Sequence, residues 1–184
     1  MKEMVMSQDE ILAACKRIGG ELTARLKDEE RLPLFVCVMR GALPFMADLL
    51  KFVDTEVLFD YVQVSSYVGT ASTGTIHFDH DVSIDVKGRV VVIVEDVVDT
   101  GITMKFLKKH FQDLGPKEVL VASLFDKRAE RTVEVEADYV GMTLNEPKFL
   151  LGYGLDYNDI GRNIPYVYVP TKEEIERFDE KRAK

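Results

Sequence analysis

The sequence has little of several features that would assign it to a special class of protein. Its 184 residues include two cysteines, Cys15 and Cys37, too few for a disulfide framework or a cysteine-rich zinc site. We expect both thiols to be reduced and buried, in a reducing compartment. No apolar run approaches the roughly 20 residues that span a bilayer, and the first ten residues lack the long apolar segment of a signal peptide. These absences predict a cytoplasmic protein without a membrane partner.

Basic residues are also few relative to acidic ones. The chain carries 24 Lys and Arg residues against 32 Asp and Glu residues, a formal net charge of −8. Because broad binding to nucleic acid depends on positive charge, this balance argues against it. An apolar fraction of 46% and a charged fraction of 30% are ordinary for a globular protein. Without a repeat or an interdomain linker, we expect a single domain over residues 1–184.

Short apolar runs alternate with helical patterns along the middle of the chain. Helical spacing of apolar residues follows Pro44 and Met104, and capping boxes at Ser7 and Thr171 predict two further helix starts. The alternation predicts an α/β fold with a doubly wound, mainly parallel sheet flanked by helices. The apolar runs that predict strands are residues 34–38, 57–64, 90–94 and 119–124.

The most informative stretch is residues 89–103, RVVVIVEDVVDTGIT. Its β-branched run fits a strand buried on both faces, which meets Glu95 and Asp96 at its carboxyl end and then a turn that opens a helix. Ligands of open α/β sheets bind at this edge. The backbone N–H groups of the turn, with Gly101 permitting close approach, suit a phosphate monoester. A simpler alternative is a strand–turn–helix in which Asp and Thr only cap the helix.

The acidic side chains of this stretch suggest further chemistry. Glu95 and Asp96 are hard oxygen ligands that can hold sugar hydroxyls or a hydrated Mg²⁺. Asp99, at the start of the turn, is a candidate proton acceptor beside the ligand.

This stretch resembles the binding signature for phosphoribosyl diphosphate (PRPP) of the type I phosphoribosyltransferases. Two further segments, VASLFDKR at residues 121–128 and PKFLLGYGLDYND at residues 147–159, resemble the 6-oxopurine branch of that family, the hypoxanthine-guanine phosphoribosyltransferases. The resemblance covers roughly residues 30–170. It implies the type I fold, with a core at about residues 30–145 and a small hood formed by the N-terminal segment and about residues 146–170.

The resemblance also implies a role for individual residues. PRPP and its 5′-phosphate would bind Glu95, Asp96, Asp99, Thr100, Gly101, Ile102 and Thr103. The diphosphate would face Arg40 and Gly41, in a loop whose peptide bond can be cis, and Arg162 from the later segment. The purine would contact Lys127, Phe149, Leu150 and Asp156. Mg²⁺ would bind Glu95, Asp96 and, as a second ion, Asp156. Ser66 and Tyr67 would belong to a lid that excludes water.

The implied reaction is a glycosyl transfer. N9 of hypoxanthine or guanine would displace diphosphate from C1′ of PRPP, giving IMP or GMP, while Asp99 handles the proton of the base. A lysine ammonium donates hydrogen bonds and accepts none, so Lys127 can pair with a 6-oxo group but not with a 6-amino group in the same role. A flat ring at Phe149 suits stacking on a purine. Members of the family are commonly dimers or tetramers, so we expect a homo-oligomer.

Simpler alternatives remain open for each residue taken alone. Arg40 and Arg162 could be surface cations, Phe149 a core residue and Asp156 a turn residue, and the segment 65–75 could be a plain hairpin loop. A regulatory phosphoribosyltransferase-fold protein that binds RNA or DNA would share the central signature, although the acidic charge favours the enzyme. A phosphoacceptor receiver domain would share the strand-end acids but would leave residues 139–170 unexplained.

Overall fold

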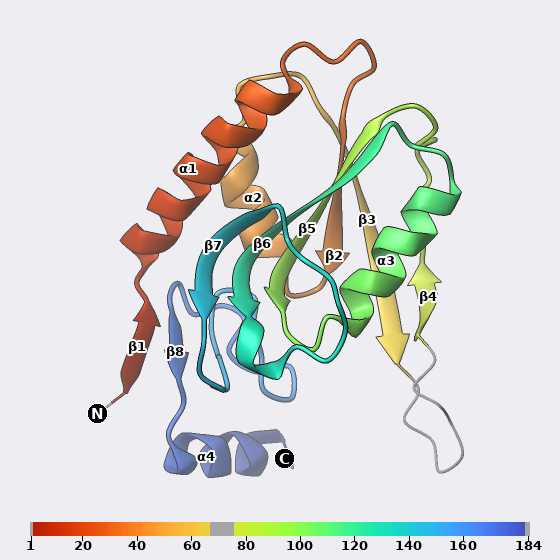
Figure 1. The fold of residues 1–184 in the computed structure, drawn as a ribbon. Helices are drawn as coiled ribbons and strands as arrows, with labels where there is room; N and C mark the ends of the chain where they lie inside the picture. The colour runs from red at the N-terminus through yellow and green to blue at the C-terminus, as the bar shows by residue number, and fades with distance from the viewer. Residues whose placement is uncertain (1, 67–75, 183–184) are drawn as a thin grey trace.

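The computed structural model describes residues 2–66 and 76–182, and within them a six-stranded sheet of order β4-β3-β2-β5-β6-β7 forms the centre (Figure 1). Neighbouring strands pair in parallel, except that β4 is antiparallel to β3. This confirms the prediction of a doubly wound, mainly parallel sheet. The strands are β2 (Leu34–Met39), β3 (Leu58–Ser66), β4 (Ile76–His80), β5 (Val90–Val98), β6 (Glu118–Lys127) and β7 (Tyr139–Leu144).

Helices cover both faces of this sheet. α1 (Gln8–Leu26) and α2 (Leu43–Leu50) lie on one face, and α3 (Ile102–Asp113) lies on the other (Figure 1). Side chains of β5 alternate between the two layers: the even-numbered valines from 90 to 94 pack with α1 and α2, and Val91 and Ile93 pack with α3. Both faces of β5 are therefore buried, which explains its unbroken apolar run.

The predicted boundary of β5 was wrong by four residues. The strand does not end at residue 94 but continues through Glu95 and Asp96 to Val98, with Glu95 opposite Ser123 and Val98 opposite Asp126 of β6. Pairing with a longer neighbouring strand keeps this acidic segment extended. Glu95 and Asp96 therefore lie within the last residues of β5, and the loop begins only at Asp99.

A glycine allows α1 to pack closely against its neighbour. A Cβ at Gly19 would lie 2.6 Å from Cβ of Phe52, so glycine allows α1 to approach the segment after α2, whereas Gly20 faces open space.

Cys15 and Cys37 are free and buried, and burial raises the pKa of their thiols to about 11 and about 12. None of the helices in the described part of the chain combines the length and apolar character needed to cross a membrane.

A second, smaller sheet joins distant parts of the sequence. β1 (Glu3–Met6) pairs antiparallel with β8 (Val167–Val169), and α4 (Lys172–Arg182) follows. Leu151, Tyr168 and Phe178 form a separate apolar cluster here. This part lies beside the lower edge of the main sheet in Figure 1, where the arrows of the parallel strands end. Segments on both sides of that edge can therefore contribute to one site.

The strand order reverses between β2 and β5. From β2 the chain proceeds outward to β3 and β4, and from β5 it proceeds in the other direction to β6 and β7. In open α/β sheets the crevice at such a reversal, outside the carboxyl ends of the strands, is where ligands bind. Arg40 directly follows β2 and Asp99 directly follows β5, so the sheet brings both residues to this crevice.

Candidate functional site

The turn between β5 and α3 presents backbone donors to a small cavity. Gly101 has φ +85° and precedes the first residue of α3, a conformation that glycine adopts without steric cost. Within residues 2–66 and 76–182, the N–H groups of Thr100, Gly101 and Thr103 have no hydrogen-bond acceptor. They adjoin a cavity of about 110 Å³ that Glu95 and Met104 also line. A helix N-terminus with several free N–H groups favours an anion.

The carbonyl groups of the same turn are all bonded to protein. The Gly101 carbonyl accepts from the N–H of Lys105 at 2.9 Å, as expected for a helix cap, and the Thr100 carbonyl accepts from the N–H of Thr132 at 3.0 Å. The carbonyls of Val98 and Asp99 accept from the guanidinium of Arg131. The turn therefore shows its donors on one side and has its acceptors bonded on the other.

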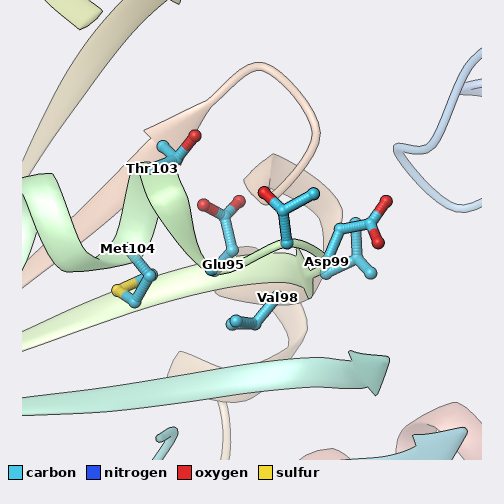
Figure 2. Close-up of a pocket in the computed structure, with 8 residues that line it drawn as sticks. Glu95, Val98, Asp99, Thr103 and Met104 are labelled. Carbon is cyan, nitrogen blue, oxygen red and sulfur yellow. The ribbon is translucent and has the colours of Figure 1, made fainter. Parts of the chain in front are cut away.

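Glu95 and Asp96 form a pair of neighbouring carboxyl groups, of which Glu95 is buried and Asp96 half-buried. Glu95 is 8% exposed, and its Oε1 accepts from the N–H of Asp96 at 3.2 Å. Burial, together with the neighbouring Asp96 carboxylate, raises the pKa of Glu95 well above its ordinary value. Burial likewise raises the pKa of Asp96, an effect that bonds from Glu95 and Val97 and the charge of Arg162 partly offset. Figure 2 shows Glu95 and Thr103 extending to the same side of the β5 end, with Val98 on the other side.

Asp99 and Lys127 meet at the ends of adjacent strands. Lys127 ends β6 with a side chain that is 8% exposed, and its Nζ lies 3.3 Å from Oδ2 of Asp99. Lys127 also pairs with Glu130. The Asp99 side chain is 47% exposed, and its Oδ1 has no hydrogen-bond partner within the described residues. The Asp99 carboxylate, which can accept a hydrogen bond, and the Lys127 ammonium therefore lie next to each other at the edge of the cavity.

The loop after β2 is held close to the buried acids. The peptide bond between Met39 and Arg40 is cis. A Cβ at Gly41 would lie 1.8 Å from Oδ2 of Asp96, so a side chain at residue 41 would displace the Asp96 carboxylate. The Arg40 guanidinium is 60% exposed and lies 3.3 Å from Oδ1 of Asp159. The cation of this loop is consequently available to a ligand in the crevice.

Residues of the 146–170 segment pack directly against that loop. A Cβ at Gly154 would lie 2.0 Å from the carbonyl oxygen of Gly41. The Arg162 guanidinium donates to the Gly154 carbonyl at 2.7 Å and pairs with Asp156 at 2.7 Å. Arg162 also lies near enough to Asp96 to lower the pKa of that carboxyl. Backbone contact and charge therefore join this segment to the β2 and β5 ends.

Phe149 offers a free aromatic face. Its side chain is 50% exposed, and its ring meets Tyr157 edge-on with 6.0 Å between centroids. The next residue, Leu150, buries its side chain in the main core. Burial of this side chain leaves the backbone of Leu150 as its part on the ligand side, and the purine contact stays a prediction.

Comparison with known proteins agrees with this geometry. Residues 7–158 match the family model described as the phosphoribosyl transferase domain. The chain belongs to the phosphoribosyltransferase family. It is 44% identical to the hypoxanthine-guanine phosphoribosyltransferase of Streptococcus pneumoniae strain R6, over 95% of this chain and 96% of that protein. The corresponding protein of Streptococcus thermophilus is 42% identical with the same coverage.

Solved structures of the phosphoribosyltransferase family share the fold. A hypoxanthine phosphoribosyltransferase of Staphylococcus aureus superposes with a TM-score of 0.88 at 33% identity, covering 95% of this chain and 94% of that one.

The structure brings most of the predicted site residues of this phosphoribosyltransferase together. Asp156, predicted to hold a second ion, pairs with Arg162, and the described residues contain no cluster of three metal-ligating side chains. Ser66 is the last residue of β3, and Tyr67 lies outside the described residues. The predicted lid therefore stays a prediction.

One residue that contacts the turn was not predicted from the sequence. The guanidinium of Arg131 bonds the carbonyl groups of Val98 and Asp99. Arg131 belongs to no local motif, because these partners are distant in sequence. A pattern of neighbouring residues carries no signal for such contacts.

Proposed function

We propose that this chain transfers the 5-phosphoribosyl group of PRPP to N9 of hypoxanthine or guanine, giving IMP or GMP and diphosphate. The observation that carries the proposal is the turn at residues 99–103, whose free N–H groups adjoin the Asp99–Lys127 pair in the crevice where the strand order reverses. A phosphate on the turn would leave the sugar directed toward Glu95 and Asp96. The similarity to hypoxanthine-guanine and hypoxanthine phosphoribosyltransferases supports the same reaction.

Four charged residues bind the sugar and the leaving diphosphate. Glu95 and Asp96 hold the ribose diol, and Arg40 and Arg162 face the diphosphate, where a planar guanidinium pairs well with phosphate oxygens. The ion pair with Asp156 holds the Arg162 side chain in place before diphosphate binds.

Mg²⁺ is part of the proposal. Two neighbouring carboxyl groups with raised pKa values fit a divalent cation, because a positive ion beside them would offset their desolvation and mutual repulsion. Glu95 and Asp96 would hold this ion, and Asp156 a second one nearer the diphosphate. When bound, the ion neutralises charge that develops on the departing diphosphate.

The base is recognised and deprotonated at the ends of β5 and β6. The purine stacks on the exposed face of Phe149, and its edge meets the backbone at Leu150. Lys127 donates to the 6-oxo group, and Asp99 removes the proton, at N7. Lys127 and Asp99 are 3.3 Å apart, so one planar base can contact both.

A direct assay tests this function. The purified chain is incubated with PRPP, Mg²⁺ and, separately, hypoxanthine, guanine, xanthine, adenine or uracil, and diphosphate release is followed. We expect turnover with hypoxanthine or guanine, little with adenine and uracil, and loss of turnover when EDTA removes the metal. PRPP binding without turnover of any base would overturn the enzyme assignment in favour of a regulatory protein, for which binding to RNA or DNA at physiological salt is the next measurement.

The same proposal includes the setting in which the enzyme works. We infer a cytoplasmic homo-oligomer, a dimer or a tetramer. Light scattering of the purified chain measures its mass directly, and a monomer at micromolar concentration would contradict the oligomer.

A further inference from the structure

We propose that Arg131 is a positioning residue that holds the phosphate-binding turn in the conformation that exposes its N–H groups. The inference rests on the proposed function of that turn. Arg131 follows a short 3-10 helix, η1 (Arg128–Glu130), after β6. Its Nε donates to the carbonyl of Asp99 at 3.1 Å, and its Nη2 donates to the carbonyl of Val98 at 3.3 Å.

The residue after Arg131 continues the same contact. Thr132 donates its N–H to the carbonyl of Thr100 at 3.0 Å and its hydroxyl proton to the same oxygen at 3.3 Å. Three successive carbonyls of the turn, from Val98 to Thr100, are thus bonded to residues 131 and 132. A peptide group whose carbonyl is fixed on one side directs its N–H to the other, because the group is planar. The bonds therefore orient the donors of the turn toward the cavity.

Side chains of this segment also fix how closely it approaches the turn. A Cβ at Gly101 would lie 2.6 Å from Cγ1 of Val135 and 2.8 Å from Cδ of Arg131. Gly101 and Arg131 consequently fit each other: the glycine leaves the space that the arginine stem fills.

The guanidinium is engaged entirely with protein. Besides the two turn carbonyls, it bonds the carbonyl of Val135 and pairs with Asp126. The side chains of Arg131 and Asp126 are 16% and 4% exposed. A guanidinium with a planar fork can bond several acceptors in fixed directions, whereas a lysine ammonium acts as a point charge. Arg131 therefore acts on a ligand only through the turn.

Replacement of Arg131 should weaken binding of the phosphate and leave binding of the base unchanged. The variants are Arg131→Lys, which keeps the charge without the fork, and Arg131→Leu. The matched control is Arg128→Leu: Arg128 also pairs with Asp126, at 3.0 Å, but its side chain is 62% exposed and, among the described residues, forms no hydrogen bond with the turn. Inhibition constants for IMP and for inosine, which lacks the phosphate, are measured for each variant, with kcat and the KM values of PRPP and hypoxanthine.

For both Arg131 variants we expect IMP inhibition and kcat/KM for PRPP to fall by about tenfold or more, since small displacements of binding groups have effects of this size. Inosine inhibition and the KM of hypoxanthine should change little, and Arg128→Leu should resemble the parent protein. Equal losses for IMP and inosine, or full retention of IMP binding in Arg131→Lys, would overturn the role. Loss of the folded state in both variants, seen by circular dichroism, would overturn it as well.

The parent protein separates failure of this inference from failure of the proposed function. If the parent turns over hypoxanthine and binds IMP more tightly than inosine while the Arg131 variants do the same, only the positioning role fails. If the parent shows no preference for IMP over inosine, the phosphate site itself fails, and the role of Arg131 with it.

Discussion

Nζ of Lys127 lies 3.3 Å from Oδ2 of Asp99, across the carboxyl ends of two adjacent parallel strands. The ammonium is buried and the carboxylate is half exposed. A flat base that reaches both groups therefore meets a donor and an acceptor at fixed separation. This pair is the basis of the first two predictions.

Replacement of Asp99 by Asn should lower kcat by about 10²-fold or more, the size expected for loss of a general base. The amide keeps the shape of the side chain but cannot take a proton. Steady-state kinetics with PRPP and hypoxanthine measure the change. Asp113→Asn, at an exposed position at the end of α3, is the control and should keep parent activity. A kcat for Asp99→Asn close to that of the parent would remove the assignment.

Replacement of Lys127 by Gln should reduce the preference for 6-oxopurines over adenine by about tenfold or more, because in the proposed reaction the buried Lys127 ammonium is the donor that discriminates between bases. An amide can donate and accept, so it tolerates a 6-amino group. The measurement is the ratio of kcat/KM for hypoxanthine and for adenine. Lys109→Gln, an exposed lysine of α3, serves as the control. An unchanged ratio would show that another group selects the base.

Gly154→Ala should disturb the loop after β2, which contains Arg40 and Gly41. A Cβ there would lie 2.0 Å from the carbonyl oxygen of Gly41, so either residue 154 or the loop must move. Gly115→Ala is the matched control, since both glycines have positive φ and Gly115 has nothing within 4 Å of its Cβ position. We expect kcat/KM for PRPP to fall by about 10²-fold for Gly154→Ala only, with a loss of stability common to both variants. Equal kinetic effects would contradict the role of this contact.

Two adjacent glycines of α1 should respond to the same substitution with opposite signs. Gly20→Ala should stabilise the protein by about 0.5–1 kcal/mol, because alanine favours a helix and nothing lies within 4 Å of the new methyl group. Gly19→Ala should destabilise it, because its Cβ would lie 2.6 Å from Cβ of Phe52. Urea unfolding of both variants measures the difference. Stabilisation by Gly19→Ala would mean that the segment at Phe52 yields easily.

The sequence alone predicted the structural features that depend on residues close together in the chain. The β-branched run before Glu95 predicted a buried strand, and the glycine at 101 predicted a tight turn before a helix; both are confirmed. The end of β5 was missed because acidic residues after an apolar run resemble a loop, whereas pairing with β6 keeps them in the sheet.

Contacts between distant parts of the backbone could not be predicted. Arg131 bonds carbonyl groups 32 and 33 residues earlier in the chain, and a carbonyl is common to every residue, so no side-chain pattern marks it. Gly154 is likewise required by the backbone at Gly41. Such requirements appear only when the three-dimensional packing is known.

The pairing of β1 with β8 has a practical consequence for anyone who alters this protein. Strand Glu3–Met6 is remote in sequence from every polar group of the crevice, yet it supports the segment that carries Phe149 and Arg162. A fusion partner or a deletion at these few residues would therefore disturb the segment of Phe149 and Arg162 before it disturbed the turn at residues 99–103, so the position of a tag matters here.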